Sequence, residues 1–240
     1  MNPLTRRSFL KSSACGTASG WLATAVGSAA DNRDQPGGKE TFRLTREIPV
    51  EKGLDLVVAG GGPAGAAAAI CAARLGAKVA LIEATGGLGG MGTNGLVSLW
   101  FSLTDGIRSV VGGLILELMQ ALCRDNMASP NALERFKKGL PIDSIGFQPE
   151  ALKLLLDKLC ADAGVEVRFL TRVVEADADS QQRRVRGVIT SSVEGLRYLR
   201  AATFIDATGD AVLADLCGAA ARAAGRDTPK IMPPTLCAAV

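Results

Sequence analysis

The stretch that decides the fold reads Leu54-Asp55-Leu56-Val57-Val58-Ala59-Gly60-Gly61-Gly62-Pro63-Ala64-Gly65. Its first half is a short apolar run, which favours a strand buried in a parallel sheet. Its second half is a glycine turn, and the alanine-rich residues 66–75 that follow predict a helix ending at Gly76. The apolar run Lys78–Glu83 predicts a second strand. These residues therefore form a β-α-β unit, whose parallel strands imply a right-handed crossover.

The glycines of this turn have the spacing G-x-G-x-x-G between a strand and a helix, which is the context that dinucleotide binding requires. Gly60 allows the tight turn, Gly62 lets a diphosphate approach the backbone, and Gly65 lets helix and strand pack closely. The N-terminus of the helix offers free N–H groups to the phosphates. Glu83 ends the second strand, where its carboxylate would accept hydrogen bonds from ribose hydroxyls and would repel the 2′-phosphate of NADP.

The first unit does not distinguish FAD from NAD, because both contain ADP. Two later features favour FAD. Six glycines crowd the ten residues 86–95, just after Glu83, and would let backbone approach a second part of a long cofactor. Far downstream, residues 205–210 read Ile-Asp-Ala-Thr-Gly-Asp and place another small-residue turn after a strand. The alternative for the first segment is a mobile surface loop. The second segment, taken in isolation, is better explained as an ordinary strand-end turn.

Together these motifs resemble the glutathione-reductase-like FAD superfamily, and more narrowly a family of FAD-dependent oxidoreductases related to the flavoprotein subunit of heterodisulfide reductase. The resemblance runs from Leu54 to the C-terminus. Besides the two strands and the glycine turn, it rests on Leu88-Gly89-Gly90-Met91-Gly92-Thr93, Thr171-Arg172-Val173 and Ile205-Asp206-Ala207-Thr208-Gly209-Asp210.

The resemblance implies a role for each motif. Gly89, Gly90 and Met91 would contact the ribityl and flavin portion, and Val173 would hold the adenine through its backbone. Ala207, Thr208, Gly209 and Asp210 would close over the diphosphate. The remaining cofactor residues expected here are the turn and the ribose-binding acid: Gly60, Gly61, Gly62, Pro63, Ala64, Gly65 and Glu83.

The fold class expected is α/β, a Rossmann-like FAD-binding domain with a parallel sheet and a small antiparallel β-meander. We expect this domain over 54–240, with part of a substrate domain inserted around 96–147. Members of the family are longer, with a substrate domain and a second glycine–aspartate motif. The apolar run 236–240 resembles a strand entering a further domain, so we expect a front portion of a longer or split protein, with a missing C-terminal half or an electron-transfer partner.

Further elements follow from periodicity. We expect helices over 110–123 and from Pro149 to Gly164, where leucines repeat at helical spacing, with residues 124–147 irregular between them. Four strands follow at 165–174, 184–191, 196–200 and 203–206. The first three would form the meander.

Composition narrows the chemistry. The chain has no histidine, which removes the commonest general base and metal ligand. Its six cysteines form no C-x-x-C pair, so we expect no metal site and interpret most thiols as buried. The mature chain is close to neutral, which gives no electrostatic argument for nucleic acid. No catalytic residue stands out: Tyr198 and the arginines at 108, 124 and 135 are better explained by packing or solvation.

The N-terminus resembles a twin-arginine export signal. Thr5-Arg6-Arg7-Ser8-Phe9-Leu10-Lys11 matches that motif, and a mildly apolar stretch follows to Ser28-Ala29-Ala30, where small residues allow cleavage before Asp31. We therefore expect a signal over 1–30, a linker over 31–53, passage through the twin-arginine machinery and a periplasmic or otherwise exported location. Cys15 lacks the preceding aliphatic residue of a lipoprotein site.

Three functions remain open at this stage. The favoured one is an FAD-dependent oxidoreductase that transfers a hydride between a small-molecule substrate and bound FAD. The alternatives are a non-catalytic nucleotide-binding module and an NAD-dependent dehydrogenase, although the latter does not explain the second glycine cluster or the late Ala-Thr-Gly turn.

Overall fold

The computed structural model describes residues 41–179, 181, 183–222, 227 and 237. The chain divides into two units, residues 1–45 and 46–240, and every helix and strand described lies in the second. The expected signal and residues 31–40 of the expected linker lie outside the described residues, as does all of the expected strand at 236–240 except Cys237. Within the described part of the chain, no helix is long and apolar enough to cross a membrane.

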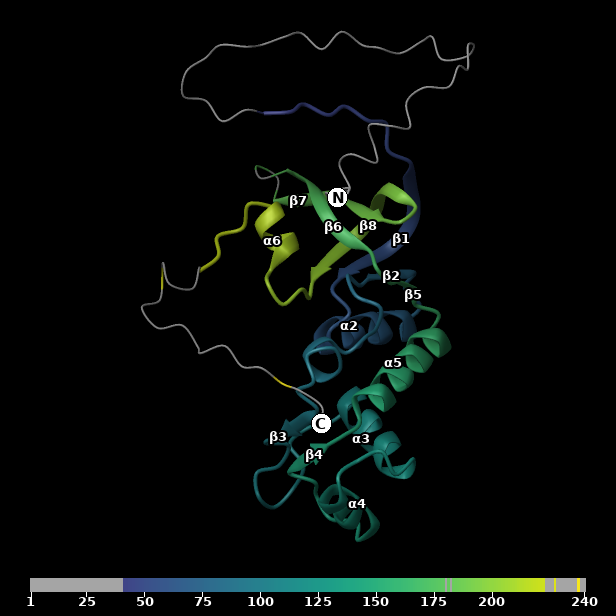
Figure 1. Ribbon diagram of the computed structural model, residues 1–240, viewed down its shortest axis with the longest axis vertical. Helices are drawn as coiled ribbons and strands as arrows, with labels where there is room; N and C mark the ends of the chain where they lie inside the picture. Colours follow the sequence, from purple (N-terminus) through teal and green to yellow (C-terminus); the bar gives the residue numbers. More distant parts are fainter. Residues whose placement is uncertain (1–40, 180, 182, 223–226, 228–236, 238–240) are drawn as a thin grey trace, which may run out of the picture. The chain divides into compact units, whose positions relative to one another are not determined.

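The second unit is built on one six-stranded sheet with the order β5-β2-β1-β8-β7-β6 (Figure 1). β5, β2, β1 and β8 are parallel, whereas β8, β7 and β6 are antiparallel. The strands are β1 (Val50–Ala59), β2 (Val79–Ile82), β5 (Glu166–Arg168), β6 (Arg172–Asp179), β7 (Arg184–Ser192) and β8 (Gly195–Asp206). The α/β fold, with its parallel sheet and antiparallel meander, is confirmed.

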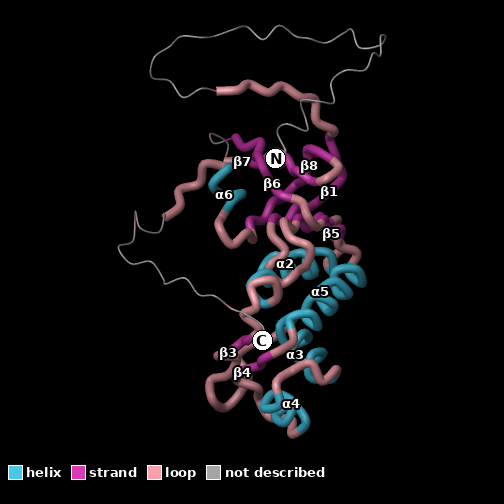
Figure 2. Tube along the Cα trace, in the orientation of Figure 1, coloured by secondary structure: helices cyan, strands magenta, loops and turns pink. Residues whose placement is uncertain are grey.

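One face of the parallel strands is covered by two helices, α2 (Pro63–Arg74) and α5 (Pro149–Ala163), which contact each other (Figure 2). Side chains alternate along β1, so that Leu56 and Val58 join the core beneath these helices. α2 ends as expected, because Leu75 leaves the helix and Gly76 has a φ of +93°. α5 also ends at the predicted residue, Gly164, in the left-handed region.

The opposite face packs against the meander and a short helix, α6 (Val212–Leu216). Val57 and Ala59 of β1 point to this side and form a second core with Val188, Leu199 and Leu213. The parallel strands therefore lie between two apolar layers, which explains why their sequence is apolar at nearly every position.

The expected single strand 165–174 is wrong. β5 ends at Arg168 and pairs with β2, whereas β6 begins at Arg172 and pairs with β7. The break comes at Leu170, which has a φ of +50° and is exposed, a conformation that an apolar strand pattern does not predict. Conversely, the strands expected at 196–200 and 203–206 are one continuous strand, β8, which serves both the meander and the parallel sheet.

Residues 96–147 contain a second, two-stranded sheet and two helices, and they share the core of the parallel strands through residues such as Leu118 and Ile145. β3 (Leu99–Phe101) pairs antiparallel with β4 (Ser144–Gly146), and α3 (Leu114–Arg124) and α4 (Pro130–Lys137) lie between them in sequence. The expectation that 124–147 is irregular is wrong, since α4 and β4 both fall there. α4 escapes a periodicity search because it is only eight residues long. α3 starts four residues later than expected, after Gly113 at a φ of +60°.

Candidate functional site

The first glycine turn is shaped by two close backbone approaches. A Cβ on Gly65 would lie 1.8 Å from the carbonyl oxygen of Gly60, so only glycine lets α2 approach the end of β1 this closely. Gly60 has a φ of +95°, and a Cβ there would lie 2.6 Å from the carbonyl oxygen of Ala207. Gly62 differs, because nothing lies within 4 Å of its Cβ position. Its open side is where a ligand can approach the backbone.

The N-terminus of α2 adjoins this opening. Pro63 occupies the first helical turn, no side chain caps the helix, and no acidic residue stands in its first turn. A helix of this length carries partial positive charge at such an end, and its first N–H groups have no intrahelical partner. The turn and the helix end together suit an anionic group, as the sequence predicts.

Glu83 is buried, with 8% of its surface exposed, and its carboxylate is held at both oxygens. Oε2 accepts a 2.7 Å hydrogen bond from the Gly61 amide. Oε1 accepts bonds from the amide and the hydroxyl of Thr85, at 2.7 and 2.6 Å. Since a carboxylate has about four acceptor positions, the carboxylate keeps capacity for a ribose hydroxyl. Thr85 is a contributor that the sequence interpretation missed; its signal is a hydroxyl two residues after the acid.

The second glycine cluster contacts the first. The Gly89 amide donates a 2.8 Å hydrogen bond to the carbonyl of Gly61. A Cβ on Gly90 would lie 3.0 Å from the Cα of Gly62, at the start of the short 3-10 helix η1 (Gly90–Gly92). Thr93, which is fully buried, fixes this loop by donating to the carbonyl of Leu88 at 2.6 Å. Met91 is exposed. The loop therefore lies against the first glycine turn and is not a remote surface loop.

The Ala-Thr-Gly turn is the third segment at the same place. Its Ala207 amide donates to the carbonyl of Ala59 at 2.8 Å, directly before Gly60. We use the name glycine cradle for these three segments: Gly60–Gly65, Gly89–Gly90 and Ala207–Thr208. Gly209 has open space at its Cβ position, and Asp210 is exposed.

Asp206 organises the turn. Its Oδ1 accepts from the amide and hydroxyl of Thr208, at 2.9 and 2.6 Å, and its Oδ2 accepts from the Ala214 amide at 2.8 Å. Burial tends to raise the pKa of this carboxyl, but these hydrogen bonds together lower it below its ordinary value. Asp206 therefore joins the turn to α6, which supports its interpretation as a turn residue.

Val173 lies on β6, opposite Thr190 of β7, and is half-buried. Two residues before it, the Thr171 amide donates a 3.0 Å hydrogen bond to the carbonyl of Glu83. This bond brings the start of β6 beside the acid at the end of β2. The two segments that the resemblance assigns to the adenosine portion thus meet in the structure.

Other candidate side chains have structural partners. Arg108 pairs with Asp105 at 3.2 Å within a turn, and Arg135 donates to the carbonyl of Pro141. Arg124 closes α3. The Tyr198 hydroxyl donates a 2.8 Å hydrogen bond to Asp177. Burial and, to a smaller extent, this bond raise the pKa of the phenol.

Only some of the described thiols are buried. Cys123 and Cys160 are buried as expected, but Cys71 is exposed, because the apolar stretch around it lies on a helix with one face open. Burial, with a smaller contribution from Asp157, raises the pKa of Cys160 to about 11. Among the described residues, no cluster of three or more cysteine, aspartate or glutamate side chains is arranged to hold a metal.

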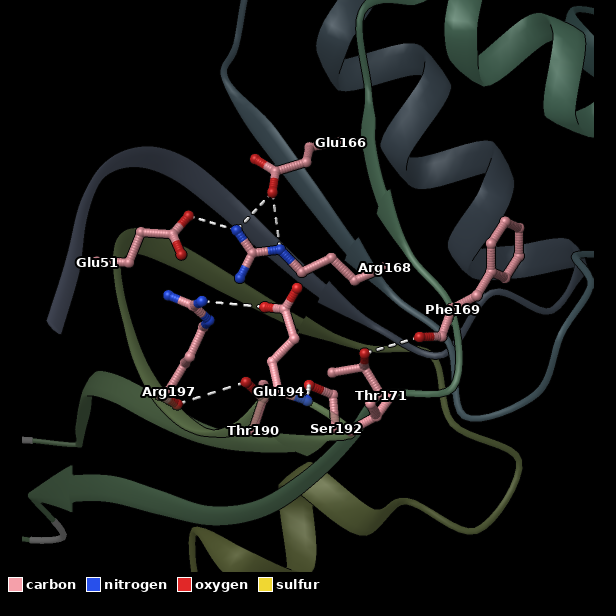
Figure 3. A pocket seen from close by; sticks show the side chains of 10 residues that line it. Glu51, Glu166, Arg168, Phe169, Thr171, Thr190, Ser192, Glu194 and Arg197 are labelled. Carbon is pink, nitrogen blue, oxygen red and sulfur yellow. Dashed lines mark hydrogen bonds and ion pairs between the residues drawn. The ribbon is translucent and has the colours of Figure 1, made fainter. Parts of the chain in front are cut away.

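A charged pocket (Figure 3) includes in its lining Thr171, which donates to the Glu83 carbonyl, and Thr190, which lies opposite Val173. Its volume is about 520 Å³, and Arg168 lies between Glu51 and Glu166 on its wall. Arg197 pairs with Glu194 at 3.0 Å. Since these charges already pair with one another, the pocket offers little to a charged ligand.

The family model described as FAD dependent oxidoreductase matches residues 55–240. The search of curated proteins gave no match. Similar solved structures include the THI4 protein of Thermovibrio ammonificans, with 17% identity and a TM-score of 0.46, covering 69% of this chain and 63% of that one.

Two more solved structures are similar to this chain over less than half of their own length. A geranylgeranyl bacteriochlorophyll reductase-like protein of Thermoplasma acidophilum has 19% identity, a TM-score of 0.48, and coverage of 72% of this chain and 43% of that chain. The p-nitrophenol 4-monooxygenase of Pseudomonas putida has 18% identity, a TM-score of 0.49, and coverage of 71% and 44%. The chain thus spans less than two thirds of each of these three proteins. By the match over residues 55–240, the chain belongs to the FAD dependent oxidoreductase family.

Proposed function

We propose that this chain binds FAD along the glycine cradle and forms the cofactor-binding part of an oxidoreductase. The observation that carries the proposal is the meeting of three distant segments around the open side of Gly62. A Cβ on Gly60 would lie 2.6 Å from the carbonyl oxygen of Ala207, and a Cβ on Gly90 would lie 3.0 Å from the Cα of Gly62, so both approaches between segments leave little room for a side chain. Such crowding supports a backbone surface kept bare for a ligand.

The residues divide among the parts of FAD. Gly60–Gly65 and the end of α2 would take the diphosphate, and Glu83 would accept a ribose hydroxyl. Val173 would meet the adenine, and Ala207, Thr208, Gly209 and Asp210 would close over the diphosphate. Gly89, Gly90 and the exposed Met91 would lie along the ribityl chain toward the flavin.

Bound FAD would supply the redox chemistry, exchanging a hydride with a small-molecule substrate. The chain's own residues bind and orient the cofactor. A non-catalytic nucleotide-binding module is the second candidate, because Arg108, Arg135 and Tyr198 are all engaged in structural contacts and none is assigned a catalytic role. Adding a reducing substrate separates the two candidates, because an oxidoreductase would reduce its bound FAD, whereas the module would bind FAD and leave it oxidised.

The first test is direct. The purified full chain should carry visible flavin absorbance, release FAD on denaturation, and take up added FAD after stripping. NAD serves as the competing ligand in the same titration. A colourless chain that ignores FAD, or one that prefers NAD, contradicts the proposal.

We further propose export by the twin-arginine machinery, on the strength of Thr5–Lys11 and the small residues at Ser28–Ala30. Replacing Arg6 and Arg7 together by lysine should leave the chain in the cytoplasm of a bacterial host. Cell fractionation measures this. Equal periplasmic amounts of wild type and variant would refute the proposal.

A further inference from the structure

An apolar cavity of about 320 Å³ adjoins the glycine cradle. No charged side chain lines it, and the indole N–H of Trp100 is its one side-chain hydrogen-bond donor. Its lining residues come from α2, α3, α5, β3 and the second glycine loop: Pro63, Ala64, Ala67, Gly89, Trp100, Leu114, Ile115, Leu118, Leu152 and Leu156.

The cavity has a buried floor and an accessible mouth. Leu118, Leu152 and Leu156 are each at most 7% exposed, whereas Pro63 and Ala64 are exposed. Trp100 forms a wall and packs against Phe147, with ring centroids 4.5 Å apart and planes tilted by 49°. This contact helps to fix the indole in place. A ligand therefore has a route in at the start of α2.

The mouth is shared with the cradle. Pro63 and Ala64 stand at the N-terminus of α2, and Gly89 is bonded to the carbonyl of Gly61. An occupant of the cavity would thus touch the two loops that we propose to hold FAD.

We infer that this cavity binds an uncharged, apolar small molecule; given the proposed FAD function, this is the apolar part of the substrate. The volume lies at the lower end of the range for small-molecule sites, which begins at about 300 Å³. A carboxylate or phosphate would lose its hydration there without gaining a partner, so charged compounds are excluded. An apolar group can instead fill the cavity without displacing well-bound water.

The test uses a matched pair of probes on the full chain. Cyclohexyl methyl ketone and cyclohexanecarboxylate have the same ring and similar size, but only the second is charged. The chain has two tryptophans, Trp21 and Trp100, so in W21F the fluorescence reports on the cavity wall alone. The ketone should change this fluorescence saturably, and the carboxylate should bind at least about tenfold more weakly.

Filling the cavity supplies the control. Ala67→Phe places a ring in the cavity and should weaken ketone binding at least about tenfold. Cys71→Phe, one turn along the same helix at an exposed position outside the lining, should leave binding unchanged. Ala67→Leu is the milder substitute if Ala67→Phe does not fold.

FAD binding is measured on the same samples, which separates this inference from the proposed function. Saturable ketone binding that persists in FAD-loaded protein supports the inference. Failure of the ketone to bind while FAD is retained overturns the inference alone, and so does direct competition by FAD, because the cavity would then belong to the cofactor. Ketone binding without any FAD binding overturns the substrate assignment and the proposed function together, while the apolar site stands.

Discussion

The Gly61 amide donates a 2.7 Å hydrogen bond to Oε2 of Glu83, across 22 residues of sequence. The acid expected to hold a ribose therefore also fixes the glycine turn that would hold the diphosphate. A Cβ on Gly61 would lie 2.9 Å from the same oxygen and 2.6 Å from Leu88. The glycine turn, Glu83 and the second glycine loop are thus in direct contact. A substitution of Glu83 should therefore affect both the stability of the fold and the binding of FAD.

Glu83→Gln should weaken FAD binding about tenfold and lower the free energy of unfolding by about 1–3 kcal/mol. The amide keeps one acceptor oxygen, but its nitrogen cannot accept the bonds from Thr85. Thr85→Val is the control, because it removes the hydroxyl bond to Glu83, together with those to Gly87 and Asn94, and leaves the Glu83 side chain in place. Flavin titration and denaturant unfolding measure both quantities. Equal FAD affinity in wild type and Glu83→Gln would exclude Glu83 as the ribose ligand.

Two alanine substitutions in one turn should have opposite effects. Gly62→Ala meets nothing within 4 Å, and Gly62 has a φ of −65°, so the variant should fold with wild-type stability. Its methyl group should nonetheless lower FAD affinity at least about tenfold, by standing where the diphosphate approaches the backbone.

Gly65→Ala should instead disrupt folding, because its Cβ would lie 1.8 Å from the carbonyl oxygen of Gly60. The loss of stability should reach about 3 kcal/mol or more, as expected for severe overpacking. Thermal unfolding of both variants, followed by flavin titration of the folded one, checks the pair. A destabilised Gly62→Ala with normal FAD affinity would reverse the assigned roles.

Motifs with a physical mechanism predicted the site best. The turn at Gly60, the helix end at Gly76 and the link between residues 205–210 and the first turn are all present, because backbone geometry demands small residues there. The FAD dependent oxidoreductase family is confirmed, whereas the role of each residue expected to bind the cofactor stays a prediction.

Local patterns predicted less well where tertiary pairing decides. Residues 165–174 look like one apolar strand, yet the exposed Leu170 divides them between two edges of the sheet. β1 begins at Val50, within the expected linker, because it extends past Gly53 to pair with β8. The β1–β8 pairing joins residues more than a hundred positions apart, and the β2–β5 pairing joins Ala80 to Glu166, so no local window contains both partners.

Acid should loosen the Asp206 turn. The pKa of this carboxyl in the folded chain lies below its ordinary value of 3.8, so the carboxylate stabilises the fold at neutral pH. That stability is present above the ordinary value and is lost as the pH falls through the lower, folded value. Asp206→Asn should therefore be less stable than wild type near neutral pH, and the difference should shrink below about pH 4. Denaturant unfolding across this range measures it; a difference independent of pH would contradict the assignment.

Thiol reactivity should separate the cysteines by their surroundings. Cys71 is exposed on α2 and should react with a thiol reagent in the native chain near neutral pH. Cys123 and Cys160 are buried, and burial raises the pKa of both thiols, to about 11 at Cys160, so very little of either is thiolate at that pH. Cys71→Ser should remove a fast phase of labelling, whereas Cys160→Ser should leave every fast phase in place and remove one thiol that reacts only after denaturation. Mass spectrometry of labelled peptides identifies each site. Rapid native labelling of Cys160 would mean that α5 opens readily and that the core beneath the parallel strands is looser than its packing implies.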